Sequence, residues 1–196
     1  ICHQTYHLAH PALNLYGWDY LEYGFMEIAK QKPELLNADF LTELTPHELI
    51  SFIKPFFSPN HDPMNCTLDA LEERAHLWIN MALLIKKNKK SHLEYFTQSN
   101  GEAQYFYENL SKCQAYADPL RKKTSFLMKL LMESHMVYFS DEQDLIPIMD
   151  YHMQRVLLRT GCVQVLDKSL NWALKNRSPL ENDLEIREAC IESMKL

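Results

Sequence analysis

Apolar residues recur at three- and four-residue steps along most of the chain, which is the spacing of amphipathic α-helices. The clearest case follows Thr67, where one face of the expected helix is apolar and the opposite face is charged. This helix ends in a basic run at residues 86–90, which we interpret as a solvated end. We expect its apolar face to lie in the core, and that face comprises Leu68, Leu71, Ala75, Trp78, Ile79, Ala82 and Leu83.

Helix start and stop signals predict the ends of the other helices. Residues 45–48 (TPHE) have the form of a capping box with Pro at the first helical position. Asp118-Pro119 predicts an N-cap followed by Pro, and Gly161 predicts a left-handed C-terminal stop. Residues 58–63, which hold two prolines, and residues 140–147 are expected to be loops. The expected helices and helical turns cover residues 12–30, 37–41, 46–57, 93–97, 103–112, 120–139, 150–160, 169–175 and 184–196.

Composition supports the same all-α class. Of 196 residues only 4 are Gly and 4 are Val, whereas sheet-rich folds favour β-branched residues in strands and Gly in tight turns. The helix over residues 120–139 is apolar over much of its surface, so we expect it near the centre. We predict a single compact multi-helix domain over residues 1–196, with both ends trimmed or disordered.

Charge and cysteine usage limit the partners and the compartment. The formal net charge of −6 argues against a protein that covers duplex DNA, although a local basic groove can coexist with it. No run approaches the ~18 apolar residues that a membrane span needs. The five cysteines are far apart and contain no Cys-x-x-Cys pair, so neither a zinc ribbon nor an iron–sulfur loop is indicated. Dispersed thiols in odd number fit reduced cysteines, and we predict a cytoplasmic protein without a membrane partner.

One acidic group follows an apolar stretch. Residues 145–149 (LIPIM) precede Asp150, so the carboxylate emerges from a segment that we expect to be buried. A structural N-cap explains an Asp at this position completely, because its side chain accepts from free N–H groups and suits the positive end of the helix dipole. The buried approach leaves a functional carboxylate as the alternative.

A cationic triplet, Arg121-Lys122-Lys123, stands at another predicted helix start, where the dipole favours acidic residues. Such a triplet is either a solvated helix end or an anion site. Spacing alone does not separate the two.

The Asp150 segment resembles the catalytic motif of the helix-hairpin-helix DNA glycosylase superfamily, in which a loop with Pro leads to Asp, then His, Arg-Val and Arg-x-Gly. From about residue 17 to residue 190 the chain also resembles the queuosine salvage proteins, which are queuosine 5′-phosphate N-glycosidases with a related helical fold. The similar segments are NADFLTELTPHELISFI (37–53), LDALEERAHLWINMALLI (68–85), the Lys122-Lys123 helix, MDYHMQRVLLRTGCV (149–163) and LEIREAC (184–190).

This resemblance implies cleavage of the N-glycosidic bond of a modified nucleoside or nucleotide, with release of a base such as queuine and with no metal or organic cofactor. It places Asp150 beside the anomeric carbon, where the carboxylate stabilises an oxocarbenium-like transition state or activates water. It makes Lys123, followed by Thr124 and Phe126 as in the archaeal 8-oxoguanine glycosylases, the active cation. The implied substrate-binding residues are Lys122, Tyr151, His152, Arg155 and the base-stacking Trp18.

Two departures limit the resemblance. The salvage family has an acidic residue just before a Leu-Asn pair, whereas Leu13-Asn14 follows Pro11-Ala12 here. Residues 102–160 contain no Gly, so the Gly-rich hairpin with which DNA glycosylases grip phosphates is missing and a small ligand is favoured over DNA. A base-excision glycosylase/lyase with Lys123 as Schiff-base nucleophile is the first alternative, and a non-catalytic nucleoside-binding protein is the second.

Other candidate residues carry weaker patterns. His3, His7 and His10 have the helical spacing of metal ligands, but a frayed terminus explains them as well. The aromatic run that includes Trp18 stacks on a base or belongs to the core. Glu72 or Glu73 with Arg74, and Glu185 with Arg187, are expected to form structural ion pairs.

Overall fold

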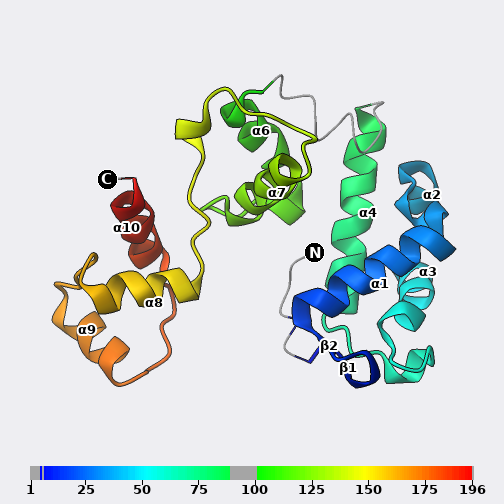
Figure 1. Cartoon of the computed structure of the whole chain (residues 1–196), viewed down its shortest axis with the longest axis horizontal. Coiled ribbons are helices and arrows are strands. Elements are labelled where there is room, and N and C mark those ends of the chain that lie inside the picture. The colour runs from blue at the N-terminus through cyan, green and yellow to red at the C-terminus, as the bar shows by residue number, and fades with distance from the viewer. Residues whose placement is uncertain (1–4, 6, 89–100, 196) are drawn as a thin grey trace. The chain divides into compact units, whose positions relative to one another are not determined.

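The computed structural model describes residue 5, residues 7–88 and residues 101–195, and it is all-α (Figure 1). Its strands within those residues, β1 (Ala9–His10) and β2 (Leu15–Tyr16), form one short antiparallel pair. Contacts divide the chain into two compact units, residues 1–100 with 112–117 and residues 101–111 with 118–196. One domain over residues 1–196 stays a prediction.

Each unit has its own helices. The first contains α1 (Gly17–Gln31), α2 (Ala38–Glu43), α3 (Pro46–Ile53) and α4 (Leu71–Lys87), with short 3₁₀ turns between them. The second contains α6 (Ala103–Leu110), α7 (Lys122–Glu133), α8 (Tyr151–Thr160), α9 (Lys168–Lys175) and α10 (Leu184–Met194). The helix expected at residues 93–97 lies outside the described residues.

The local signals for helix ends are confirmed in three of four cases. Thr45 and Glu48 form the capping box, Asp150 caps α8, and Gly161 ends it with φ 80°. The first helix starts at Gly17 and not at residue 12, because the chain first turns back on itself at Asn14 (φ 55°) to pair β1 with β2. Helix propensity yields here to the strand pairing.

The start of α7 differs from the expectation. Asp118 is not the N-cap, because the helix begins four residues later behind Arg121, whose backbone is left-handed (φ 54°). The Asp118 carboxylate still reaches the helix end, where Oδ2 accepts from the backbone N–H of Lys122 at 2.6 Å. The helix ends at Glu133, and it buries one face (Thr124, Ser125, Met128 and Leu131) while Leu130 is exposed.

The long helix α4 packs on two sides, which the single apolar face did not predict. Trp78 and Ala82 lie in the core of the first unit as expected, where the Trp78 ring meets Phe25 edge to face at 5.4 Å. Leu83 is half exposed, whereas Leu77 and Met81 are buried. Elements α2 and α3 cover one side of α4, and the 3₁₀ turn Gln114–Tyr116 covers another. Arg74 is buried and donates from Nε to the Asp69 carbonyl at 2.7 Å.

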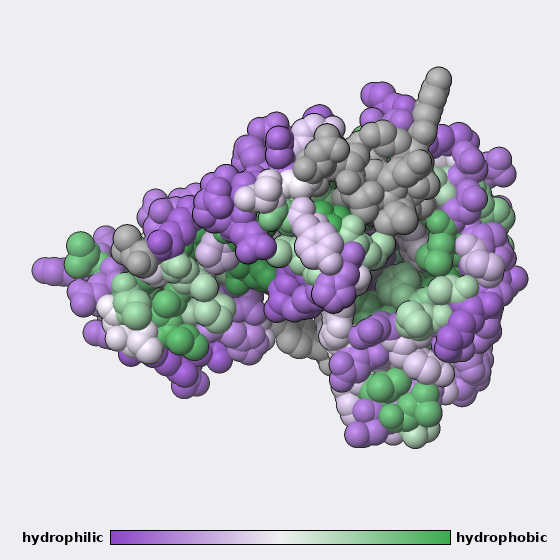
Figure 2. All heavy atoms as spheres, turned by 45° about the horizontal axis from the view of Figure 1, so that its top comes forward, coloured by the Kyte–Doolittle hydropathy of each residue, from purple (hydrophilic) through white to green (hydrophobic). Residues whose placement is uncertain are grey.

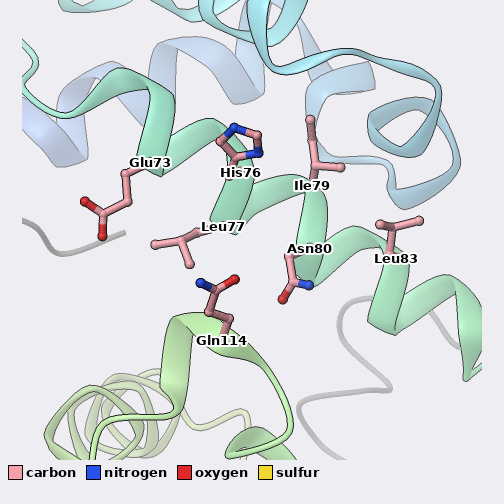
Figure 3. A pocket seen from close by; sticks show the side chains of 7 residues that line it. All are labelled: Glu73, His76, Leu77, Ile79, Asn80, Leu83 and Gln114. Atoms are coloured by element: carbon pink, nitrogen blue, oxygen red, sulfur yellow. The ribbon is translucent and has the colours of Figure 1, made fainter.

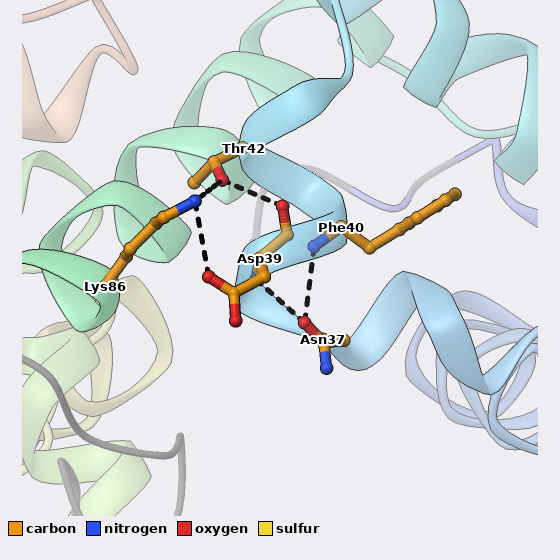
Figure 4. Close-up of polar contacts among 5 residues, drawn as sticks. All are labelled: Asn37, Asp39, Phe40, Thr42 and Lys86. Carbon is orange, nitrogen blue, oxygen red and sulfur yellow. Dashed lines mark hydrogen bonds and ion pairs between the residues drawn. The ribbon is translucent and has the colours of Figure 1, made fainter.

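A polar contact holds α2 against α4 (Figure 4). The Lys86 ammonium lies 3.3 Å from Asp39 Oδ1 and donates to Thr42 Oγ1 at 3.2 Å, so this lysine is not simply solvated as expected. Asn37 caps α2 by accepting from the backbone N–H groups of Asp39 and Phe40. Lys89 and Lys90 lie outside the described residues.

A second hydrophobic cluster joins α8 to α10. Its fully or almost fully buried members are Met149, Ile186, Cys190 and Ile191, and Leu157, Leu170 and Leu174 pack against them. Asp183 links the same helices, because its Oδ2 accepts from Arg187 Nε at 2.9 Å and from Gln154 Nε2 at 3.3 Å. The expected Glu185–Arg187 ion pair is therefore wrong. Arg187 lies one helical turn after Asp183, at i and i+4, where side chains meet, whereas residues two positions apart in a helix do not face each other.

Asp183 makes stability depend on pH. Burial raises the pKa of its carboxyl, but the hydrogen bonds from Arg187 and Gln154 outweigh burial and lower it below 3.8. A lowered folded-state pKa contributes stability that is complete above the unfolded value and is lost as the pH falls through the folded value.

We expect Asp183→Asn to lower the free energy of unfolding by roughly 0.5–1 kcal/mol near neutral pH, a modest loss because the pair is partly exposed. Urea titrations at several pH values measure this, and the gap between wild type and variant should close below pH 3.8. Glu188→Gln, at an exposed position of the same helix, is the control and should change little. A gap that widened toward acid pH would contradict the assigned contact.

Candidate functional site

Asp150 stands where irregular chain enters α8. Its backbone is extended (φ −117°, ψ 177°), and its side chain turns back so that Oδ1 accepts from the Met153 N–H at 2.9 Å. This bond satisfies one N–H of the helix start and fixes the carboxylate at the positive end of the helix. The side chain is half-buried, so one face of the fixed anion is reachable from solvent.

The expected buried approach to Asp150 is confirmed for Met149 only, because residues 145–148 are half-buried. Met149 has no exposed surface, and Ile146 packs in the same cluster, as does Leu120 from the segment just before α7. The starts of α7 and α8 therefore share one hydrophobic cluster. This cluster anchors the backbone on the N-terminal side of Asp150.

Three of the expected substrate-binding residues lie together on the first two turns of α8. The rings of Tyr151 and His152 are 3.9 Å apart between centroids, and the Arg155 guanidinium lies 5.5 Å from the centre of the Tyr151 ring. All three side chains are exposed. An aromatic and cationic surface thus adjoins the carboxylate of Asp150, and such surfaces stack on planar bases.

Arg121 and the N-terminal end of α7 already have partners within the chain. Arg121 lies over the Tyr107 ring at 5.2 Å and reaches Gln104 Oε1 at 3.5 Å, while the Asp118 carboxylate occupies the helix end. Lys122 and Lys123 are half-buried on the first turn of α7. Within the part of the chain that the structure describes, no ion pair joins either lysine to Asp150. Lys123 and Asp150 thus belong to the same unit, and no ion pair between them is formed in the described part of the chain.

Trp18 belongs to the first unit, on the first turn of α1, and its side chain is 42% exposed. The nearby aromatic residues are expected either to stack on a base or to belong to the core, and the structure shows both exposed and core positions. Tyr20 and Phe25 are core, since both rings pack against Phe57, whereas Tyr23 is partly exposed. Gly24 permits this packing, because a Cβ at this position would lie 2.3 Å from the Phe57 ring.

The histidine pattern at the N-terminal end is not a helix face. His3 lies outside the described residues, and His7 and His10 lie in a turn and in β1. His10 instead packs edge to face on Tyr20 at 5.3 Å. Burial, with smaller effects from Cys66 and Tyr23, raises the pKa of the Tyr20 hydroxyl to about 12, so this phenol stays neutral.

A cavity that sequence reasoning missed lies beside the segment leading to Asp150. Its volume is about 430 Å³, within the range of small-molecule sites. Residues 145–148 form one wall and α7 forms the other, with Tyr107 of α6 between them. The Tyr107 hydroxyl is 2.9 Å from Ser125 Oγ and accepts from the Ile146 N–H at 2.9 Å. The lining residues are Tyr107, Ser125, Met128, Lys129, Met132, Glu133, Leu145, Ile146, Pro147 and Ile148.

A second cavity of about 630 Å³ lies in the first unit, along α4 (Figure 3). Glu73, His76 and Asn80 line it from one face of the helix, and Gln114 approaches from the facing 3₁₀ turn. Asn80 is engaged in this wall, because its Oδ1 accepts from Cys113 Sγ at 3.7 Å. Most of the lining side chains are exposed, which makes this a shallow hollow compared with the Tyr107 cavity.

Comparisons with protein-family models and with curated proteins find no match for the chain. Among the described residues, no helix is long and apolar enough to cross a membrane. The described cysteines, at positions 66, 113, 162 and 190, form no disulfide. The functional assignment therefore depends on the geometry around Asp150.

We expect Tyr107→Phe to lower the free energy of unfolding by about 1–3 kcal/mol, because it removes the hydroxyl shared by Ile146 and Ser125. Amide hydrogen exchange at Ile146 should become faster, which localises the loss to this wall of the cavity. Tyr105→Phe, at an exposed position of the same helix, is the matched control and should leave both measurements near wild type. Unchanged protection of the Ile146 amide would show that the bridge is not formed.

Proposed function

We propose that the chain hydrolyses the N-glycosidic bond of a modified nucleoside or nucleotide, with Asp150 as the catalytic carboxylate. The observation that carries the proposal is the fixed, half-buried Asp150 at the start of α8, with an aromatic and cationic surface beside it. The resemblance of residues 149–163 to the glycosylase motif supports the same reaction.

The chemistry needs a fixed anion because positive charge develops on the sugar as its bond to the base breaks. A carboxylate held in advance stabilises that charge most strongly in the transition state, and a typical loss on removing such a group is ~3–4 kcal/mol of barrier. The hydrogen bond to Met153 uses Oδ1, and Oδ2 has no hydrogen-bond partner among the described residues, so it remains available to substrate or water. Asp150 then either faces the anomeric carbon or takes a proton from the attacking water.

The base can be held without a metal by the rings next to Asp150, or in the Tyr107 cavity, which residues 145–148 line and Asp150 does not. Tyr151 and His152 offer stacking faces, and the Tyr107 cavity offers a mainly apolar site with Met128 and Met132 among its walls. Thioethers pack well on aromatic rings, as a deazapurine such as queuine requires. Lys122, Lys123 and Arg155 supply positive charge in the same unit for a sugar phosphate.

We expect Asp150→Asn to reduce base release by on the order of 100-fold or more while the protein stays folded, because Asn keeps the cap and removes the charge. The assay incubates the protein with queuosine, queuosine 5′-phosphate and a panel of damaged-base duplexes, and it measures free base by mass spectrometry. Asp167→Asn is the matched control, since Asp167 caps α9 in the same way through the Leu170 N–H.

The outcomes separate the proposed roles of Asp150. Loss of base release in Asp150→Asn with normal turnover in Asp167→Asn supports a catalytic carboxylate. Equal and near-normal turnover in both variants would leave Asp150 as a helix cap only. Absence of base release from every substrate by wild-type protein would favour the non-catalytic binding protein.

Lys123 distinguishes hydrolysis from lyase chemistry. A lyase needs the neutral amine of Lys123 to attack the sugar, and borohydride would then trap a covalent protein–DNA adduct. We expect no adduct, because a hydrolase uses the lysine as a cation, and we expect Lys123→Arg to keep part of the activity since the charge is preserved. A trapped adduct that is lost in Lys123→Ala would replace the hydrolase with the glycosylase/lyase.

A further inference from the structure

Positive charge is concentrated in one short part of this acidic protein. Residues 151–178 contain five of the chain's 20 basic residues and one of its 26 acidic residues, whereas the whole chain has a net charge of −6. This segment comprises α8, α9 and the residues that follow each of them. Such a contrast is the electrostatic footprint of a polyanion site.

Helix α9 presents a basic and aromatic face. Lys168, Trp172 and Lys175 are spaced at i, i+4 and i+7, so they lie along one side of the helix, and Trp172 is 63% exposed. Leu170 and Leu174 point the other way and pack on the cluster around Met149. Leu170 and Leu174 therefore make the contacts of α9 with the core, and Trp172 is not a core residue.

Helix α8 repeats this division. Tyr151, Arg155 and Arg159 follow at four-residue steps on its exposed side, and Arg155 lies over the Tyr151 ring. Met153 and Leu157 pack on the same hydrophobic cluster as α9. The part of the chain with α8 and α9 lies at the left in Figure 1 and again at the left in Figure 2. There, hydrophobic side chains (green) lie at the surface between hydrophilic ones (purple).

The cations of this segment are not used for ion pairing within the described chain. None of Arg155, Arg159 and Lys168 has a carboxylate within 4.0 Å there, and the same holds for Lys175 and Arg177. The single acidic residue, Asp167, is held by Ser169 Oγ at 2.6 Å and by the Leu170 N–H at 2.7 Å. Five exposed like charges repel one another, so an external anion lowers their energy.

We propose that single-stranded nucleic acid binds to the α8–α9 surface, which we define as Tyr151, Arg155, Arg159, Lys168, Trp172, Lys175 and Arg177. Lysine and arginine side chains contact the phosphates, and unpaired bases stack on the exposed rings. A membrane surface fits less well, because an interfacial helix inserts its apolar face, and Leu170 and Leu174 on the apolar face of α9 already pack in the core. The proposal goes beyond the proposed function and does not depend on Asp150.

The test measures binding of the whole chain to fluorescein-labelled oligothymidylate and oligouridylate of about 20 nucleotides, longer than the site of one small domain. Fluorescence anisotropy over a series of salt concentrations gives the affinity and its salt slope. A duplex of equal length and vesicles of mixed phosphatidylserine and phosphatidylcholine are the competing ligands.

We expect Lys168→Ala/Lys175→Ala to reduce the slope of log affinity against log salt by about 1.4, which is two phosphate contacts at ~0.7 each. Trp172→Ala should weaken binding about tenfold and leave the slope unchanged, because stacking releases no counterions. Lys32→Ala/Lys87→Ala and Tyr138→Ala are the matched controls, at exposed lysines and an exposed tyrosine outside the α8–α9 surface. These surface variants should keep the wild-type circular dichroism.

Three results would overturn the proposal. The first is no binding of either oligonucleotide at low salt. The second is equal weakening by the surface variants and by their controls, which would mean a diffuse charge effect. The third is tighter binding to the duplex or to the anionic vesicles than to the single strands, which would assign the surface to that partner.

Discussion

Met149 lies fully buried in the cluster that α8 and α10 share, and the residues on both sides of it take their positions from that burial. Covering a side chain of this size stabilises a fold by about 1.5–3 kcal/mol, which is enough to hold the segment in one place. Residues 145–148 before Met149 form a wall of the Tyr107 cavity, and Asp150 after it caps α8. One apolar contact therefore positions both a cavity wall and a carboxylate.

Asp150 and Asp167 make the same capping hydrogen bond in different surroundings, so a capping role is compatible with the catalytic role proposed for Asp150. Both carboxylates accept from the N–H three residues ahead, at 2.9 Å and 2.7 Å. Asp167 is exposed and has Ser169 as its second partner, whereas Asp150 is half-buried and follows the fully buried Met149. A cap fixes an anion in advance, which is what stabilisation of a developing cation needs. Asp150 and Asp167 therefore differ in their burial and their neighbours, and not in the capping hydrogen bond.

Helix α8 serves three purposes along ten residues. Its inner side packs on α10, its first turn carries Asp150 and the Tyr151–His152 pair, and its outer side carries Arg155 and Arg159. These purposes are compatible because a helix with 3.6 residues per turn separates its faces. The acidic charge of the whole chain hides this local basic surface, so net charge alone is a poor guide to its partners.

The sequence by itself determined the helical class and the ends of most helices, because caps, prolines and C-terminal glycines act over three or four residues. Thr45, Asp150 and Gly161 act as the sequence predicts, whereas Asp118 does not, since the left-handed Arg121 moves the start of α7. Only the tertiary structure decided that α4 packs on two sides and that Asp183 accepts a hydrogen bond from Gln154 of α8. The tertiary structure alone formed the Tyr107 cavity. Its hydrogen bonds join Tyr107 to Ser125, which is 18 positions away, and to Ile146, which is 39 positions away. Contacts over such distances depend on how helices pack, and no local pattern of hydrophobic and polar residues encodes them.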